Sequence, residues 1–318
     1  MKTIYIILAL TLAIQFVSGQ NRITEKVSFK SGDETITGIL VKPNSGDNLP
    51  VVVFQQGSGN FAFEGYDKEA WGPHKFYIED VLLEQGYAVL YCNKRGLGGS
   101  TGNWRKNDFY GRAADAYAAI EYLKTLPEID ANRIGVSGHS QGGWIAQITA
   151  AEYDDVAFII CLAGPTVGVK EQIYSHDKFQ FECEGYEGDK LEKKIKKRKK
   201  SLNKSYNIGK NFGIIGAAKH LYLIFNYENN EVLKSIKCPA LLLFAEFDIN
   251  VDPEENIDHL NQIFENKIPN NITVKTMPKG QHGFYKVENR CVPWGEAEKN
   301  DFDSNFQNQI KDWVSELN

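Results

Sequence analysis

Short apolar runs alternate with longer amphipathic stretches along most of the chain. Apolar runs of about four to eight residues are typical of buried strands, whereas apolar residues at every third or fourth position are typical of helices. The runs that we interpret as parallel strands are 49–54, 87–92, 133–137, 157–163, 240–245 and 272–277. The helical pattern marks 67–85, 108–126, 144–151 and 306–317. This alternation predicts an α/β protein with a mostly parallel sheet flanked by helices, which 28–41 precedes as an antiparallel hairpin.

The strand pattern is lost in the middle of the chain. We predict that about 166–236 is an inserted, mainly helical cap over the sheet. Lysine dominates 190–204, and two interpretations fit this run. It is either a solvated helix face, with Leu191 and Ile195 packing beneath it, or a basic rim that attracts an anionic substrate or surface. Similarly, the apolar cluster 221–225 suits either the core of the cap or an acyl pocket.

The most specific signal is a serine between two glycines. The strand-like run 133–137 leads to Gly138, Ser140 and Gly142, and a helical pattern follows. This is a G-x-S-x-G sequence in a strand, turn and helix context. Small residues are required because so sharp a turn leaves no room for side chains beside the serine. We expect the turn to expose the Ser140 hydroxyl and to direct the helix N-terminus toward an oxyanion formed there.

Candidate partners for Ser140 follow later strands. Asp248 comes directly after the run 240–245, and His282 lies in a loop after 272–277. Because parallel strands end at one edge of a sheet, we expect these side chains to converge there. Asp252 is the alternative acid, since it lies only four residues after Asp248.

Together these residues resemble the α/β-hydrolase superfamily, and most closely its secreted esterase and serine-aminopeptidase-like branch. That branch is also similar to dienelactone hydrolases and acyl-CoA thioesterases. The resemblance rests on the chain order serine, acid, histidine and on five further segments: 57–59 (GSG), 95–102 (RGLGGSTG), 129–143 (IDANRIGVSGHSQGG), 248–253 (DINVDP) and 280–284 (GQHGF). It implies an α/β-hydrolase fold after about residue 40, except for the central insertion. The chain departs from many relatives at Gln56, where they carry histidine.

The expected chemistry is acyl transfer to Ser140 and then to water. His282 would act as general base and then general acid, while Asp248 would orient its imidazole. We expect the backbone N–H groups of Gln141 and Ser58 to form the oxyanion hole. These roles need no cofactor, and the sequence contains no metal-ligand spacing of histidine, cysteine and carboxylates.

Several activities remain compatible with this machinery. The leading hypothesis is hydrolysis of a carboxylic ester, with a small-molecule ester or short peptide as substrate. An aminopeptidase-like serine peptidase would need a carboxylate in the cap to hold the substrate amine, and Glu182, Glu184 and Glu187 are candidates. An acyl thioesterase with the same triad is a further alternative, as is a noncatalytic binding protein on the same fold.

The net charge and the N-terminal residues indicate which partners and which cellular location to expect. The net charge of −5 is mild and does not suggest a nucleic-acid partner. Residues 1–19 combine a lysine, an apolar run and small residues, which predicts a secretory signal peptide rather than a membrane span. We therefore expect an exported periplasmic or extracellular protein, with 20–318 as the α/β-hydrolase domain and no stable membrane insertion after cleavage.

Three further predictions concern residues outside the proposed triad and oxyanion hole. Cys183 and Cys291 lie in loop-like polar sequence and are able to pair in an oxidising compartment, although the sequence gives no distance between them. On the predicted helix 108–126, Arg112 and Asp115 are interpreted as a solvated face or a local ion pair. Arg95 is expected to tie its glycine-rich loop to nearby backbone, with substrate binding as the alternative.

Overall fold

The computed structural model describes residues 22–44, 46–63, 78–212, 216–297 and 304–317. The predicted signal peptide, 1–19, lies outside these ranges, as does most of the first predicted helix. What is described of that helix is α1 (Asp80–Glu84), which is followed by Gly86 at φ +79°. A positive φ is easily adopted by glycine, and it ends the helix before the next strand.

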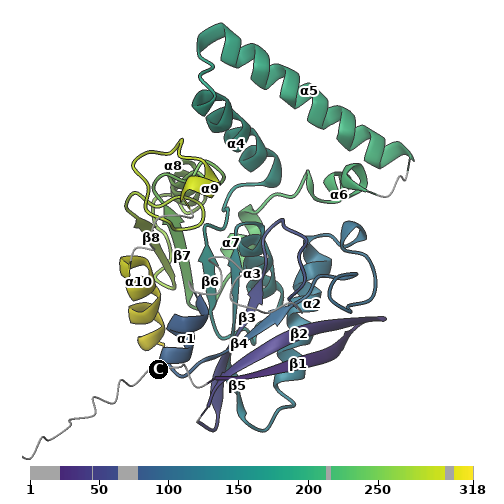
Figure 1. The fold of residues 1–318 in the computed structure, drawn as a ribbon, viewed down its shortest axis with the longest axis vertical. Helices are drawn as coiled ribbons and strands as arrows, with labels where there is room; N and C mark the ends of the chain where they lie inside the picture. Colours follow the sequence, from purple (N-terminus) through teal and green to yellow (C-terminus); the bar gives the residue numbers. More distant parts are fainter. Residues whose placement is uncertain (1–21, 45, 64–77, 213–215, 298–303, 318) are drawn as a thin grey trace, which may run out of the picture.

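Within the described ranges, one eight-stranded sheet runs through the molecule in the order β1-β2-β4-β3-β5-β6-β7-β8 (Figure 1). The strands are β1 (Arg22–Ser31), β2 (Glu34–Pro43), β3 (Leu49–Gln55), β4 (Ala88–Cys92), β5 (Ile129–His139), β6 (Ile159–Leu162), β7 (Ala240–Ala245) and β8 (Ile272–Met277). The β1–β2 hairpin is antiparallel and joins β4 in antiparallel register. All other neighbours are parallel, which confirms the predicted sheet.

Helices cover both faces of the sheet, as the alternating pattern predicted. One face packs against α2 (Phe109–Leu123), α3 (Gln141–Glu152), α7 (Asn230–Ser235) and α8 (Pro253–Ile263). The other packs against α1 and α10 (Ser304–Ser315). In α10 the apolar side chains Phe306, Ile310 and Val314 recur at helical spacing, and each is fully buried. Burying this stripe against the sheet is what stabilises so short a helix.

Three helices stand beyond the carboxyl ends of the parallel strands (Figure 1). They are α4 (Val169–Cys183), α5 (Gly188–Phe212) and α6 (Ala217–Ile224), and we call them the cap. Hydrogen bonds hold the chain just before and just after the cap against α3. Trp144 Nε1 donates to the Val167 carbonyl at 3.0 Å, and Asn229 Nδ2 donates to Gln147 Oε1 at 2.6 Å. The cap is thus seated over the edge where the strand ends meet.

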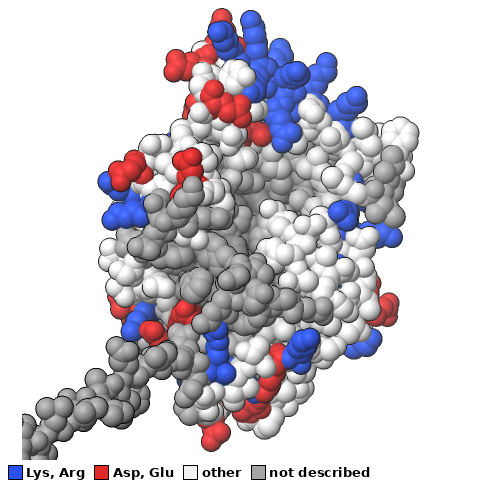
Figure 2. Space-filling view, viewed as in Figure 1, with Lys and Arg blue, Asp and Glu red and all other residues white. Residues whose placement is uncertain are grey.

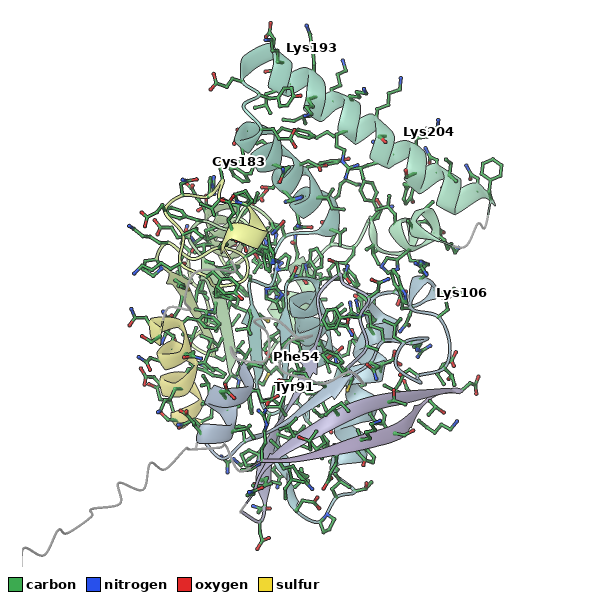
Figure 3. All side chains as sticks on the ribbon, in the orientation of Figure 1. Phe54, Tyr91, Lys106, Cys183, Lys193 and Lys204 are labelled. Carbon is green, nitrogen blue, oxygen red and sulfur yellow. A yellow bond between two sulfur atoms is a disulfide. The ribbon has the colours of Figure 1, made fainter. Side chains whose placement is uncertain are left out.

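The lysines of α5 cover the outer side of the cap. Figure 2 shows them as a basic cluster at the top of the molecule, and Lys193 and Lys204 point outward in Figure 3. Leu191 and Ile195 are half-buried beneath, as expected for a solvated helix face. Arg198 is different, because its Nε donates to both carboxylate oxygens of Asp177 on α4, at 3.1 and 2.9 Å.

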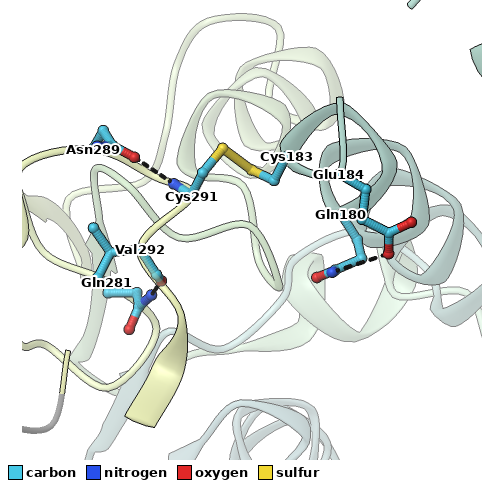
Figure 4. Close-up of a disulfide and its surroundings, with 7 residues drawn as sticks. All are labelled: Gln180, Cys183, Glu184, Gln281, Asn289, Cys291 and Val292. Atoms are coloured by element: carbon cyan, nitrogen blue, oxygen red, sulfur yellow. Dashed lines mark hydrogen bonds between the residues drawn. A yellow bond between two sulfur atoms is a disulfide. The ribbon is translucent and has the colours of Figure 1, made fainter. Parts of the chain in front are cut away.

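A disulfide joins Cys183 at the end of α4 to Cys291, 108 residues later in the chain (Figure 4). The loop that contains Cys291 follows β8 and also carries His282. The bond therefore links the cap covalently to the loop of the candidate catalytic histidine. Cys92 and Cys161 are buried free thiols, and burial raises the pKa of Cys161 to about 12. Such a thiol stays protonated, as expected for a packing residue.

Candidate active site

Ser140 lies at the junction of β5 and α3 in a strained backbone conformation. Its φ and ψ are 56° and −125°, a combination that L-residues rarely adopt. The Ser140 N–H donates to the Leu162 carbonyl at 2.9 Å, so the neighbouring strand β6 holds the turn in place. Strain maintained by surrounding structure is typical of functional turns.

The glycines around Ser140 are required by close backbone contacts. A Cβ at Gly138 would lie 2.0 Å from the Gly142 carbonyl oxygen, and one at Gly142 would lie 2.1 Å from that of Gln55. Neither neighbour is a flexible side chain that can move aside. The sequence G-x-S-x-G therefore reflects the space available where β3, β5 and α3 meet.

We expect Gly138→Ala to destabilise the protein by about 3 kcal/mol, because the added methyl overpacks a backbone-lined site. It should also lower the reactivity of Ser140 by displacing its hydroxyl. Gly295→Ala is the matched control, since nothing lies within 4 Å of its added Cβ. Thermal unfolding and activity of both variants measure the effect. A Gly138→Ala protein as stable and as active as Gly295→Ala would contradict the proposed packing.

His282 and Asp248 form a buried hydrogen-bonded pair. His282 Nδ1 lies 2.6 Å from Asp248 Oδ2, and Asp248 is fully buried. The other oxygen, Oδ1, accepts from the backbone N–H groups of Asn250 at 2.7 Å and Val251 at 3.0 Å. These bonds fix the carboxylate, which in turn orients the imidazole.

The loop that carries His282 also contacts the turn 138–142 around Ser140, which we call the elbow. The Nε2 atom of His139 lies 2.9 Å from the His282 carbonyl oxygen.

Asp252, the alternative acid, has other roles. Its Oδ1 accepts from the Glu255 N–H as the cap of α8, and its Oδ2 accepts from Arg290. The structure therefore pairs His282 with Asp248 and leaves Asp252 with a structural function.

The two residues expected to form the oxyanion hole lie beside Ser140. Gln141 is the first residue of α3, so its backbone N–H is at the positive end of the helix. The loop at 57–59 also approaches the serine, because a Cβ at Gly57 would lie 3.7 Å from Ser140 Oγ. Ser58, Ser140, Gln141 and His282 line one cavity of about 560 Å³ beneath the cap.

We call this cavity the Arg198 arm. Its lining is about half apolar and half polar, and the apolar half includes Val169, Ile173, Leu202, Ile224 and Trp294. Among the described residues, the aspartate, glutamate, lysine and arginine side chains in its lining are Asp177 and Arg198, which are bound to each other. The arm therefore offers a substrate a nearly neutral environment with both apolar and polar contacts.

Arg112 is a component of the site that the sequence interpretation placed wrongly. It is buried rather than solvated. Its Nη1 donates to Gln141 Oε1 and its Nη2 to the Gln56 carbonyl, both at 2.7 Å. Burial lowers the pKa of Arg112 to about 10, although nearby Asp115 opposes the shift. The spacing of Phe109, Arg112 and Ala116 places all three on the inward face of α2, which is a signal that the sequence contained.

Lys94 is a second supporting residue, and no motif or spacing in the sequence marked it. Its Nζ donates to the carbonyls of Gly57 and Gly59, at 2.6 Å each. Burial and, secondarily, the charge of Arg112 lower its pKa well below the usual value. The amine thus fixes both ends of the loop that approaches Ser140.

Arg95 was expected to bind nearby backbone, and this expectation is wrong. Its guanidinium binds the buried carboxylate of Asp115, with Nη2 donating to Oδ1 at 2.7 Å and Nε donating to Oδ2 at 2.9 Å. Asn107 and Ser31 also donate to Asp115. The interpretation of Asp115 as solvated is therefore also wrong, because packing of the loops over α2 covers it.

Two absences hold for the part of the chain that the structure describes. It contains no group of three or more histidine, cysteine, aspartate or glutamate residues placed to hold a metal ion. None of its helices combines the length and apolar character needed to cross a membrane.

Comparison with known families identifies this arrangement. The sequence profile of the X-Pro dipeptidyl-peptidase (S15) family matches residues 35–223, more than half of the chain. The chain belongs to the S15 family. The matched segment contains the Ser140 elbow but ends before Asp248 and His282. The S15 assignment makes the protein a serine hydrolase of the α/β-hydrolase superfamily, as the resemblance implied.

Individual proteins and solved structures are also similar to this chain. Uncharacterized protein RP471 of Rickettsia prowazekii is 28% identical over 255 residues, which cover 77% of this chain and 96% of that protein. Est1E of Butyrivibrio proteoclasticus, solved with ferulic acid, has a TM-score of 0.61 at 17% identity, covering 92% of this chain and 98% of its own. The Pyrococcus furiosus esterase Pf2001 has a TM-score of 0.59 at 16% identity, covering 92% and 91%. These structures share the fold.

Proposed function

We propose that this protein hydrolyses carboxylic esters through an acyl-enzyme on Ser140. The observation that supports this proposal is the convergence at one cavity of a serine on a strained elbow and a histidine bound to a buried aspartate. A free serine hydroxyl is a weak nucleophile, and an adjacent base is the usual means of activating it.

The proposed reaction has two balanced halves. Ser140 Oγ attacks the ester carbonyl while His282 Nε2 takes its proton, and the oxyanion accepts hydrogen bonds from the N–H groups of Gln141 and Ser58. His282 then returns the proton to the departing alcohol. A water molecule then attacks the acyl-enzyme with the same proton transfers through His282. This step releases the carboxylic acid product and restores the Ser140 hydroxyl. Asp248 keeps the imidazole in the required tautomer and stabilises its charged form.

The chemistry of the cavity favours an ester over a peptide with a free amino terminus. Glu182, Glu184 and Glu187, the candidates for holding an amine, are exposed and are not among the residues that line the Arg198 arm. The carboxylate that does line it, Asp177, is already bound by Arg198. A buried ammonium group without a partner is costly, so a peptide amine gains little there.

A serine peptidase is the second candidate function. It is supported by the family description and by Asp177, which would accept a substrate ammonium if Arg198 moved away. An acyl thioester is an ester-like substrate that the same machinery would also cleave.

The test begins with covalent labelling by a fluorophosphonate probe, which reports an activated serine without assuming a substrate. We then expect 4-nitrophenyl butyrate to be cleaved with a far higher kcat/KM than alanyl-proline 4-nitroanilide. Asp177→Asn should leave the ester rate largely unchanged. Faster cleavage of the dipeptide substrate, with loss of that activity in Asp177→Asn, would replace the esterase proposal with the peptidase.

We also propose that the protein acts after export, in the periplasm or outside the cell. Support comes from the signal-peptide pattern of residues 1–19 and from the disulfide between Cys183 and Cys291. Disulfides persist in oxidising compartments and are rare where thiols are kept reduced.

A further inference from the structure

A second cavity of about 550 Å³ adjoins the Arg198 arm at the catalytic centre. It is lined by Trp104, Arg105, His220, Gly216 and Ala217, and it shares Ser58, Gln141, Leu221 and Ile224 with the first cavity. We call it the Trp104 arm. Because the shared residues include both proposed oxyanion donors, a carbonyl held there would extend its acyl part into one arm and its alcohol part into the other.

Basic side chains surround the indole of Trp104. The Arg105 guanidinium carbon lies 4.4 Å from the centre of the ring, Lys94 Nζ lies 5.9 Å from it, and the His220 ring lies edge-on at 5.1 Å. The described residues that line this arm include no aspartate or glutamate. Asp115, nearby on α2, is bound by Arg95, Asn107 and Ser31. The positive charge of the arm is therefore not balanced within its lining.

His220 is a half-buried imidazole in the lining of this arm. Burial is the main cause that lowers its pKa to about 4, and the charges of Lys94, Arg112 and Arg105 add to the shift. Its Nδ1 is buried and has no hydrogen-bond partner among the described residues. A neutral imidazole with an unused polar atom is able to donate to or accept from a ligand in the cavity.

Arg105 is the cation that remains available to a ligand. Lys94 is held by two carbonyls, and Arg112 is held by Gln141 and Gln56. Within the described residues, Arg105 has its aromatic contact with Trp104, and its guanidinium has no carboxylate partner. One guanidinium matches one carboxylate, because its planar donors bind both oxygens at once.

We propose that the Trp104 arm binds a carboxylate carried by the ester substrate, with Arg105 as the residue that selects it. This inference deepens the proposed ester hydrolysis and rests on it. The substrate class is an ester with one free carboxylate on the side of the scissile bond that enters this arm. The neutral Arg198 arm receives the other side.

Two matched pairs of esters test the proposal on both sides of the scissile bond. Mono-4-nitrophenyl glutarate against 4-nitrophenyl pentanoate places the charge on the acyl side. 4-Acetoxybenzoate against its methyl ester places it on the alcohol side. In one of the pairs, we expect the charged ester to have a kcat/KM about 10- to 100-fold above its neutral partner at low ionic strength.

Variants of Arg105 test whether this residue causes the preference for the charged ester. Arg105→Gln should remove the preference for the charged ester, and Arg105→Glu should reverse it. Lys106→Gln is the matched control, because it removes the same charge from the adjacent exposed position, and it should keep the preference. Absence of a preference in both pairs, or a preference that survives in Arg105→Gln, would overturn the proposal.

A binding measurement separates this inference from the proposed reaction. Calorimetric titration of Ser140→Ala with the same four esters should show tighter binding of the charged member, and the double variant with Arg105→Gln should lose the difference. Failure of wild type to react with the fluorophosphonate would refute the esterase proposal alone. Equal affinity for charged and neutral esters would refute the carboxylate site, whatever the catalytic result.

Discussion

Replacing Ser140 by alanine should lower kcat for ester hydrolysis roughly 10⁶-fold, which is the scale on which a triad nucleophile acts. The acyl-enzyme cannot form without the hydroxyl, and the fluorophosphonate label should disappear. The backbone donors and the cavity remain, so a small rate above that of water alone is expected. Burst kinetics with a 4-nitrophenyl ester and labelling of the purified protein measure the two effects.

Ser201→Ala provides the comparison for this experiment, because Ser201 is exposed on α5. It should label and react as wild type does. A Ser140→Ala protein that is folded and still labels would show that another residue is the nucleophile. In the described segments Cys92 and Cys161 are poor candidates, since both thiols are buried and burial raises the pKa of each.

Asp248→Asn should lower kcat by about 10⁴-fold with little change in KM. The asparagine keeps the shape of the side chain, but its amide group no longer favours the imidazole tautomer that presents a free Nε2 to Ser140. The charged form of His282 also loses its neighbouring carboxylate. Steady-state kinetics and thermal unfolding distinguish this chemical effect from a loss of structure.

Asp252→Asn is the matched control for the acid. Asparagine is as good a helix cap as aspartate, so α8 should keep its N-terminus while the ion pair with Arg290 is lost. We expect almost normal kcat and a modest loss of stability. A larger loss of kcat in Asp252→Asn than in Asp248→Asn would reverse the assignment of the acid.

The sequence predicted those parts of the fold whose cause is local. The sheet followed from apolar run lengths, and the elbow followed from two glycines whose space is filled by backbone. Asp248 and His282 were selected because each follows a strand, and parallel strands end together. The structure brings these two side chains to 2.6 Å of each other.

The supporting residues depended on tertiary packing and were missed for that reason. Lys94 and Arg112 act on loop carbonyls whose positions no local pattern encodes. The Trp104 arm combines Arg105 with His220 from a helix more than 100 positions later, so neither residue stood out alone. For Arg112, its spacing from Phe109 and Ala116 on α2 indicated a buried position, whereas its charge favoured the solvated position that was predicted.

The bond between Cys183 and Cys291 also closes a covalent ring in the chain. Asp248 and His282 both lie inside this ring, whereas Ser140 lies outside it. During synthesis the ring cannot close until residue 291 has emerged, by which time the elbow and the cap have already been made. Once it is closed, a single cut between the two cysteines leaves Asp248 and His282 tethered to the segment that carries Ser140.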